Sequence, residues 1–190
     1  DGNTWLFVSS GHATNPALRL KLPFDTERDF AGLALLASSP SVIVVNASHP
    51  ARTLADFIAL AKQKPGGLSF GSAGVGSATH LAGEYFLSEA GIKMLHVPYK
   101  GVQEAVAAVV GNQLDCAFPP IALAMTLIQG GQLRALAVTS PQRVSVLPNT
   151  PTAAEQGLAG FDSSIWYGLV LPAGTPKPVM ATIAKQVKAV

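Results

Sequence analysis

The sequence predicts an α/β fold in two lobes that are joined by hinge strands. Short apolar runs alternate with helical patterns of about a dozen residues, which is typical of βαβ units and a largely parallel sheet. Hydrophobic residues make up 48% of the 190 residues and charged residues only 13%, a composition that favours a dense interior. Two long apolar strands, at 41–46 and 163–171, bracket a βα block. A chain that leaves one lobe, builds a second and returns has this arrangement.

The first 46 residues predict three strands and one irregular segment. A strand is expected at 4–10, and residues 11–23, which contain two prolines, are expected to be irregular. The apolar runs at 30–37 and 41–46 are separated by Ser-Ser-Pro and predict strands that are covered on both faces.

Residues 53–138 predict a regular alternation of helices and strands. Thr53 and Asp56 form a capping box at the start of a helix that should end at Pro65. Gly91 is expected to end a later helix in the left-handed conformation. The other elements expected in this block are strands at 68–71, 94–98, 114–118 and 133–138, and helices at 77–90, 103–110 and 120–129.

The last part predicts an extended loop, a capping box from Thr152 to Glu155 that opens a short helix, the strand at 163–171 and a helix from Pro178. We therefore assign residues 1–40 and 162–190 to lobe 1 and residues 41–161 to lobe 2. The hinge strands are expected near 41–46 and 163–171.

Composition argues against several classes of protein. The formal net charge is +2 and no three Lys or Arg residues are consecutive, so nucleic acid is not an expected partner. Cys116 is the only cysteine, which excludes an intramolecular disulfide and a Cys-based zinc site. No metal or other cofactor is expected, and no stretch approaches the roughly 20 apolar residues that span a bilayer. Because the chain begins at Asp1 without a signal peptide, we expect a processed or trimmed product or part of a longer protein.

The sharpest local feature is the glycine-rich segment 70–80 between a predicted strand and a predicted helix. Its glycines allow close approach of a ligand to the backbone, and a helix start supplies unpaired amides and the positive end of a dipole. The hydroxyls of Ser72, Ser77 and Thr79 add further donors. The segment therefore predicts a cradle for a carboxylate or phosphate, with the candidate contacts Ser72, Ala73, Gly74, Gly76 and Ser77. The alternative is a tight turn in which Ser77 is an ordinary N-cap.

Other glycine-rich motifs fit this segment less well. A dinucleotide fingerprint needs a glycine where Thr79 stands, and a Walker loop needs Gly-Lys before its hydroxyl residue. A nucleophile elbow needs a glycine two residues before the serine, where Phe70 and Val75 stand.

The histidines allow more than one interpretation. His80 falls on the first turn of the predicted helix and either faces a ligand or bonds to backbone as a neutral imidazole. No pairing with a second histidine or a glutamate near it has metal-ligand spacing. His96 is expected to be structural and His49 to be solvated, and Asp115 is expected to brace a loop.

Two further loops carry candidate ligand contacts. Tyr99 and Lys100 follow a predicted strand and could offer a hydroxyl and a cation to a carboxylate; alternatively they form a surface turn with Lys100 in water. Ser9, Ser10 and His12 follow the first strand and would face the cradle if the lobes close over a ligand.

Read in order, these segments resemble the Bug family of tripartite tricarboxylate transporter receptors over essentially the whole chain. Each segment is weakly diagnostic by itself, and their order makes the resemblance specific. The matching segments are Asp1-Gly2-Asn3-Thr4, Ser9-Ser10-Gly11-His12, Asn15-Pro16, Lys21-Leu22-Pro23-Phe24-Asp25, Leu68 to Gly74, Gly76-Ser77, His80-Leu81-Ala82-Gly83-Glu84, Val97-Pro98-Tyr99-Lys100-Gly101, Leu133 to Thr139, Pro151-Thr152 and Trp166-Tyr167-Gly168.

The resemblance implies a type II periplasmic-binding-protein-like fold and a periplasmic receptor without enzymatic activity. Such a receptor captures a small mono-, di- or tricarboxylate and delivers it to membrane transporter subunits. The family's signal peptide, its first strand with a glycine-rich loop, and its final elements have no counterpart here, so lobe 1 is expected to be incomplete. Pro119 stands where relatives commonly carry a polar residue.

Two other functions are compatible with the same residues. An effector-sensing domain of a regulator or signalling receptor would share the fold. A small α/β serine acyl-transfer enzyme would use Ser72 or Ser77 as its nucleophile, although no spacing of serine, histidine and acid singles out a triad.

Overall fold

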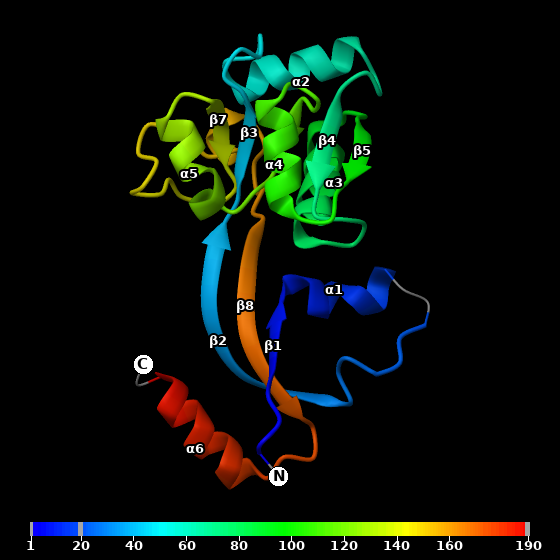
Figure 1. The fold of residues 1–190 in the computed structure, drawn as a ribbon, viewed down its shortest axis with the longest axis vertical. Coiled ribbons are helices and arrows are strands. Elements are labelled where there is room, and N and C mark those ends of the chain that lie inside the picture. Colours follow the sequence, from blue (N-terminus) through cyan, green and yellow to red (C-terminus); the bar gives the residue numbers. More distant parts are fainter. Residues whose placement is uncertain (1, 19–20, 189–190) are drawn as a thin grey trace. The chain divides into compact units, whose positions relative to one another are not determined.

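The chain divides into two compact units, which a computed structural model describes over residues 2–18 and 21–188 (Figure 1). Unit 1 comprises Asp1–Ser38 and Ile165–Val190, and unit 2 comprises Ser39–Ser164. The sequence placed the lobe boundaries at 40/41 and 161/162, whereas the units divide at 38/39 and 164/165. That the units act as hinged lobes stays a prediction.

Unit 1 contains β1 (Leu6–Ser9), α1 (Ser10–Leu18), most of β2 (Phe30–Pro40) and of β8 (Ser164–Pro172), and α6 (Lys177–Lys188). Unit 2 contains β3 (Val42–Asn46), α2 (Leu54–Gln63), β4 (Ser69–Ser72), α3 (Ala78–Ala90), β5 (Leu95–Pro98), α4 (Val102–Val110), β6 (Cys116–Ala117), α5 (Ile121–Gln129), β7 (Leu133–Val138) and the 3₁₀ helix η1 (Ala154–Gln156).

The sheet of unit 2 is mixed. Its strand order is β5-β4-β6-β3-β7, with β4 parallel to β5 and β6 and with β3 antiparallel to β6 and β7. The expectation of a largely parallel sheet is therefore right for β5, β4 and β6 and wrong for β3. Alternation of strands and helices along the chain does not report the direction in which each strand enters the sheet.

Both faces of this sheet are covered by helices (Figure 1). On β3, Ile43 and Val45 join the core that contains residues of α2 and α3, whereas Val42 and Val44 join the core of α4 and α5. This alternation is the period of two that a strand imposes on its side chains. All five residues of β3 are buried, so the strand predicted as a hinge at 41–46 packs into the core of unit 2, and its role as a hinge stays a prediction.

The predicted helix ends are present. Thr53 Oγ1 accepts a hydrogen bond from the Asp56 amide, and the Asp56 carboxylate accepts one from the Thr53 amide, at 3.1 and 3.0 Å. The reciprocal bonds between Thr152 and Glu155 measure 3.0 and 2.8 Å. Gly91 ends α3 with φ 61° and ψ 42°, the left-handed conformation that glycine adopts without strain.

Thr139 joins the segments by which the chain enters and leaves unit 2. This residue is fully buried, and its Oγ1 accepts a hydrogen bond from the Ser41 amide at 2.9 Å. The same hydroxyl lies within hydrogen-bonding distance of the carbonyl oxygens of Ser41 and Ser163. Its backbone amide donates to Ser41 and its carbonyl accepts from the Ser163 amide, so one residue holds both ends of the unit.

Unit 1 departs from two predictions. Its sheet has the order β1-β8-β2, with β1 antiparallel to β8. Residues 10–18, of which 11–18 were expected to be irregular, form α1 with Pro16 in its last turn, although a proline inside a helix removes one backbone hydrogen bond and crowds the preceding turn. In β2, Leu35 and Leu36 are 69% and 42% exposed, so the expectation of burial on both faces is wrong there. A run of apolar residues indicates a strand, but it does not show whether other elements cover both faces of that strand.

His49 is partly buried rather than solvated as expected. Its side chain is 9% exposed, its Nδ1 accepts from the Ala51 amide at 3.1 Å, and its ring centroid lies 5.6 Å from that of Phe57. The Arg134 guanidinium donates to the carbonyls of His49, Ala51 and Ala47, which draws the turn onto the unit. Burial lowers the pKa of His49; Asp115 opposes this shift and Arg134 adds to it.

Substituting Gly83 by alanine should destabilise unit 2. A Cβ atom at position 83 of α3 would lie 2.3 Å from a ring carbon of Phe70, which is fully buried on β4. Overpacking a core costs about 1–3 kcal/mol, more than the roughly 1 kcal/mol that alanine gains over glycine inside a helix. Because a contact of 2.3 Å lies far inside the ordinary range, the cost should be about 2–3 kcal/mol, and urea unfolding should show a net loss of about 1–2 kcal/mol. Combining Gly83→Ala with Phe70→Leu should recover part of it, and a neutral or stabilising Gly83→Ala would contradict the close packing.

The free energy of unfolding should fall as the pH drops below about 6.5, the ordinary pKa of histidine. Because burial holds the folded pKa of His49 below that value, the unfolded chain takes up the proton first and the folded state loses stability. His49→Asn, whose Oδ1 can still accept from the Ala51 amide, should reduce this loss. Urea unfolding at about pH 7.5 and 5.5 measures it above the range in which carboxylates titrate. An unchanged pH dependence in the variant would show that His49 does not contribute.

Candidate functional site

The carboxyl ends of the parallel strands β4 and β5 bring two predicted ligand loops together. Ser72 pairs with Pro98 in the register of the two strands, and the Tyr99 amide donates to the Ser72 carbonyl at 3.0 Å. A Cβ on Gly74 would lie 3.5 Å from the Tyr99 carbonyl oxygen. Tyr99 is half-buried, whereas Lys100 is exposed and its backbone amide donates to Glu104. Residues 72–77, here called the Gly-Ser loop, therefore lie beside the turn at 99–100.

The Gly-Ser loop needs its glycines for their backbone conformation. Gly74 has φ +106° and Gly76 has φ +81°, values that side-chain-bearing residues rarely adopt. These two positions turn the chain from the end of β4 into the first turn of α3.

Most amides of the Gly-Ser loop are already paired within it or with α3. Four donate to internal acceptors: Ala73 to Thr79 Oγ1 (2.9 Å), Gly74 to Ser72 Oγ (3.1 Å), Gly76 to His80 Nδ1 (3.1 Å) and Ser77 to the Gly74 carbonyl (3.1 Å). The prediction that the loop amides converge unpaired on an anion is thus wrong for these four in this structure. The hydroxyls that were expected to face a ligand instead close the loop on itself, and the His80 imidazole, for which two interpretations were open, takes part in this closure.

Unpaired donors remain at the start of α3. Ser77 is the N-cap, and its Oγ accepts from the His80 amide at 3.2 Å. The amides of Ala78 and Thr79 lie in the first turn of the helix, where no helical carbonyl is available to accept from them. Within residues 2–18 and 21–188, these two amides and the Val75 amide have no hydrogen-bond acceptor. Val75 is 74% exposed. The first turn of α3 therefore keeps the anion-attracting character of a helix N-terminus.

Two histidines contact the Gly-Ser loop, His96 at Ser72 and His80 at Gly76. His96 Nε2 lies 2.6 Å from Ser72 Oγ, and the rings of His96 and His80 have centroids 4.1 Å apart. His80 Nε2 lies 3.5 Å from a carboxylate oxygen of Glu84, and Phe70 stacks on His96 at 4.9 Å. Burial and then the neighbouring His80 lower the pKa of His96, whereas Glu84 acts in the opposite direction.

The sequence did not predict this pairing of His80 with His96. The register of the two strands could have predicted the contact of His96 with Ser72. Phe70 pairs with His96, and Ser72 lies on the same face of β4 as Phe70. The bond from Gly76 to His80 matches the second of the two interpretations left open for His80, a neutral imidazole bonded to backbone. Asp115 braces a loop as predicted, since its carboxylate accepts from the amide and hydroxyl of Ser69.

Ser72 Oγ lies 2.6 Å from a possible base, His96 Nε2, but it is closed to solvent. Ser72 is 0% exposed, and its hydroxyl is engaged with His96 and Gly74. The Ser77 hydroxyl caps α3. A substrate cannot reach a fully buried hydroxyl, so the geometry does not favour acyl transfer through Ser72.

The predicted contacts of unit 1 lie at the junction of β1 and α1. Ser9 pairs with Tyr167 in the β1–β8 ladder. Ser10 Oγ and His12 Nε2 are buried and have no hydrogen-bond partner among the described residues, which is rare for buried polar atoms. The His12 ring stacks on Phe24 at 5.9 Å.

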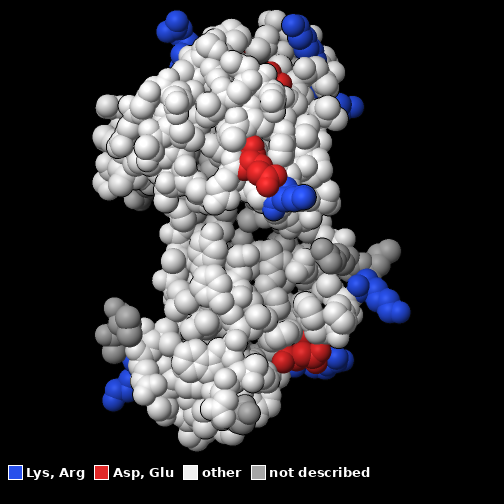
Figure 2. Space-filling view, in the orientation of Figure 1, with Lys and Arg blue, Asp and Glu red and all other residues white. Residues whose placement is uncertain are grey.

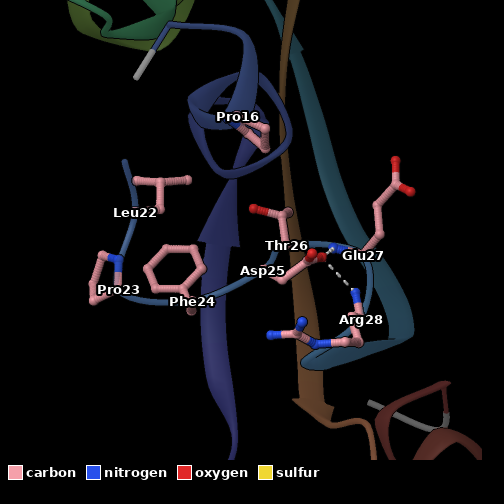
Figure 3. A pocket seen from close by; sticks show the side chains of 8 residues that line it. All are labelled: Pro16, Leu22, Pro23, Phe24, Asp25, Thr26, Glu27 and Arg28. Carbon is pink, nitrogen blue, oxygen red and sulfur yellow. Dashed lines mark hydrogen bonds between the residues drawn. The ribbon is translucent and has the colours of Figure 1, made fainter. Parts of the chain in front are cut away.

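A cavity of about 530 Å³ in unit 1 contains none of the predicted contacts (Figure 3). Thr26 Oγ1, on its wall, is buried without a partner among the residues described. The Asp25 carboxylate accepts from the amides of Glu27 and Arg28, which shapes the turn beside the cavity. No motif in this segment indicated a cavity. Its lining consists of Pro16, Leu22, Pro23, Phe24, Asp25, Thr26, Glu27 and Arg28.

The surface carries few charges. On the face drawn in Figure 2, the Lys and Arg side chains of each unit are separated by uncharged surface. Within the described ranges, no group of three or more His, Cys, Asp or Glu side chains could hold a metal ion, and no helix has the length and apolarity required to cross a membrane.

Comparison with known proteins gives consistent results. A family model described as tripartite tricarboxylate transporter family receptor matches residues 1–190. A Pseudomonas sp. (strain P51) protein, named for the tcbD-tcbE intergenic region, is 36% identical over 188 residues, which cover 98% of this chain and 56% of that protein.

Two solved structures are similar to the chain over its whole length. The Rhodopseudomonas palustris protein Rpa4515 with adipate has a TM-score of 0.90 and 30% identity, and MatC from the same species with bound malate has a TM-score of 0.88 and 29% identity. The alignments cover 100% of this chain and 64% and 65% of those chains. The chain thus spans about half the length of the curated relative. Because the family model matches residues 1–190, the chain belongs to the tripartite tricarboxylate transporter receptor family.

Proposed function

We propose that this protein is a periplasmic solute receptor that binds a small mono-, di- or tricarboxylate and delivers it to the membrane subunits of a tripartite tricarboxylate transporter. The observation that carries the proposal is the start of α3, where the unpaired Ala78 and Thr79 amides adjoin the Gly-Ser loop. Similar receptors bound to adipate and malate support a carboxylate as the ligand.

The chemistry of this edge suits a carboxylate. Two amides at a helix N-terminus can each donate to a carboxylate oxygen, and the helix dipole favours the negative charge. Lys100 is exposed on the adjacent turn and could serve a second carboxylate group. Tyr99 stays a proposed contact because its backbone adjoins Gly74.

In unit 1, Ser9, Ser10 and His12 stay proposed contacts. Burying a hydroxyl or an imidazole nitrogen without a partner costs about 1–3 kcal/mol, and a polar ligand can remove that cost. Ser10 Oγ and His12 Nε2 are such atoms. No observation in either unit favours the effector-sensing alternative over the receptor.

The proposal predicts measurable carboxylate binding without turnover. Isothermal titration of the protein with adipate, malate and citrate should give saturable binding of at least one acid, with release of heat from charge-assisted hydrogen bonds. The matching monoamides or diamides, which lack the negative charge, should bind more weakly. Absence of binding to every acid in the panel would reject the proposed function.

Gly74→Val should weaken carboxylate binding more than Ser72→Ala. Valine at φ +106° is strained by about 1–3 kcal/mol and would shift the loop, so a rise in Kd of roughly 5-fold to 150-fold is expected. Ser72→Ala removes a hydroxyl bonded to Gly74 and His96, for which about 1 kcal/mol, or roughly fivefold, is expected.

Gly131→Val is a matched control for this pair of variants. Gly131 also has a positive φ, +68°, but lies in the turn between α5 and β7, where an added Cβ meets nothing within 4 Å. It should destabilise the fold while leaving Kd near the wild-type value. Equal weakening by Gly131→Val and Gly74→Val would show that the effect is one of folding and not of the loop.

A further inference from the structure

The His80 side chain accepts a hydrogen bond from a backbone amide that would otherwise be a free donor in the middle of the Gly-Ser loop. The Gly76 amide donates to His80 Nδ1 at 3.1 Å. Nδ1 can accept this bond only while it carries no proton. The bond therefore exists with neutral His80 and is lost when the imidazole becomes a cation, because both ring nitrogens are then donors.

The ring of His80 is partly open to solvent and has titratable neighbours. Its side chain is 16% exposed at the start of α3. Two titratable groups face its ring: Glu84 on the same helix, 3.5 Å from Nε2, and His96 on β5, with a centroid distance of 4.1 Å. From β4 the ring meets uncharged Phe70.

The two imidazoles have different neighbours. Burial lowers the pKa of His96, which is engaged with Ser72 at the other end of the loop. Two stacked imidazoles repel when both are charged, and Glu84 lies beside His80. The geometry thus places one imidazole at each end of the loop, with His96 at Ser72 and His80 at the Gly76 amide.

We propose that His80 positions the Gly-Ser loop in its neutral form and releases the Gly76 amide on protonation, so that capture of a carboxylate is coupled to uptake of one proton at His80. This inference rests on the proposed function and names a regulation of the same site. Protonation adds a donor and a positive charge beside the first turn of α3, and both favour a bound carboxylate. Coupling to one full proton changes Kd by up to tenfold per pH unit.

Two substitutions at position 80 distinguish the two roles proposed for His80, which are to hold the Gly76 amide and to take up a proton. In His80→Asn, Oδ1 can take the place of Nδ1 as acceptor for the Gly76 amide, but the side chain does not titrate. His80→Ala removes the acceptor as well. A histidine that served only the fold would be replaced by asparagine without any change in the pH profile of binding.

The first experiment needs no ligand. In nuclear magnetic resonance spectra of the protein between about pH 5 and 8, the range in which histidines titrate, the Gly76 amide shift should follow the His80 ring with the same midpoint. In His80→Asn the Gly76 amide should not titrate in this range. A Gly76 amide that stays constant while His80 titrates would overturn the inference and leave the proposed function untouched.

The second experiment measures the coupling. Isothermal titration with adipate and malate at about pH 6.0 and 8.0, where carboxylates are largely ionised, should give a Kd about tenfold lower at the lower pH. Heats in buffers of different ionisation enthalpy should show proton uptake. His80→Asn should abolish both effects, even though His12 is still present.

His49→Asn is the matched control, because His49 Nδ1 also accepts a backbone amide bond but lies at the other end of β4, near Ser69 and Asp115. It should keep the pH dependence of the wild type. A pH dependence that survives His80→Asn, or that His49→Asn abolishes, would overturn the coupling. Absence of binding at every pH would instead reject the proposed function and the coupling with it, while the titration of the Gly76 amide would still decide the positioning role.

Discussion

The edge of unit 2 at which we propose carboxylate binding depends on how closely α3 packs on β4, and the Phe70 ring is the contact that sets this distance. Phe70 is fully buried and lies against the helix at Gly83, where no side chain intervenes. The same ring stacks on His96 and meets the edge of Phe118. Through His96 it supports Ser72, and through α3 it fixes the helix start that follows the Gly-Ser loop. A packing contact in the core thus sets the position of polar groups at the surface.

The glycine-rich loop has a different role from the one its composition suggests. Hydroxyls and amides in such a loop can either face a guest or satisfy one another, and here Ser72, Thr79 and His80 satisfy the loop. What remains for an anion is the first turn of α3, whose donors are unpaired because helix geometry gives them no acceptor. The loop acts chiefly by holding that turn in place.

Local signals predicted most of the elements, since caps, turns and apolar runs act over a few residues. β7 was expected at 133–138 and is found there, and the capping boxes at Thr53 and Thr152 form as expected. Features set by distant residues were missed. The partial burial of His49 involves Arg134 and Phe57, and the direction of β3 shows only in its antiparallel pairing with β6 and β7. The sequence predicted that polar loops follow β4 and β5, and the structure brings these loops together. The partners of each loop amide could not be predicted, because several acceptors compete for them.

Thr139 gives unit 2 the topology of an inserted domain. By bonding to both Ser41 and Ser163, it brings the two ends of the insert together at one buried hydroxyl. Bringing residues 41 and 163 together costs conformational entropy, because a long stretch of chain lies between them. The hydrogen bonds of Thr139, which belongs to the insert itself, offset part of that cost. A module whose ends already meet is suited to circular permutation, in which new termini are opened in a surface turn and the old ends are joined by a short linker.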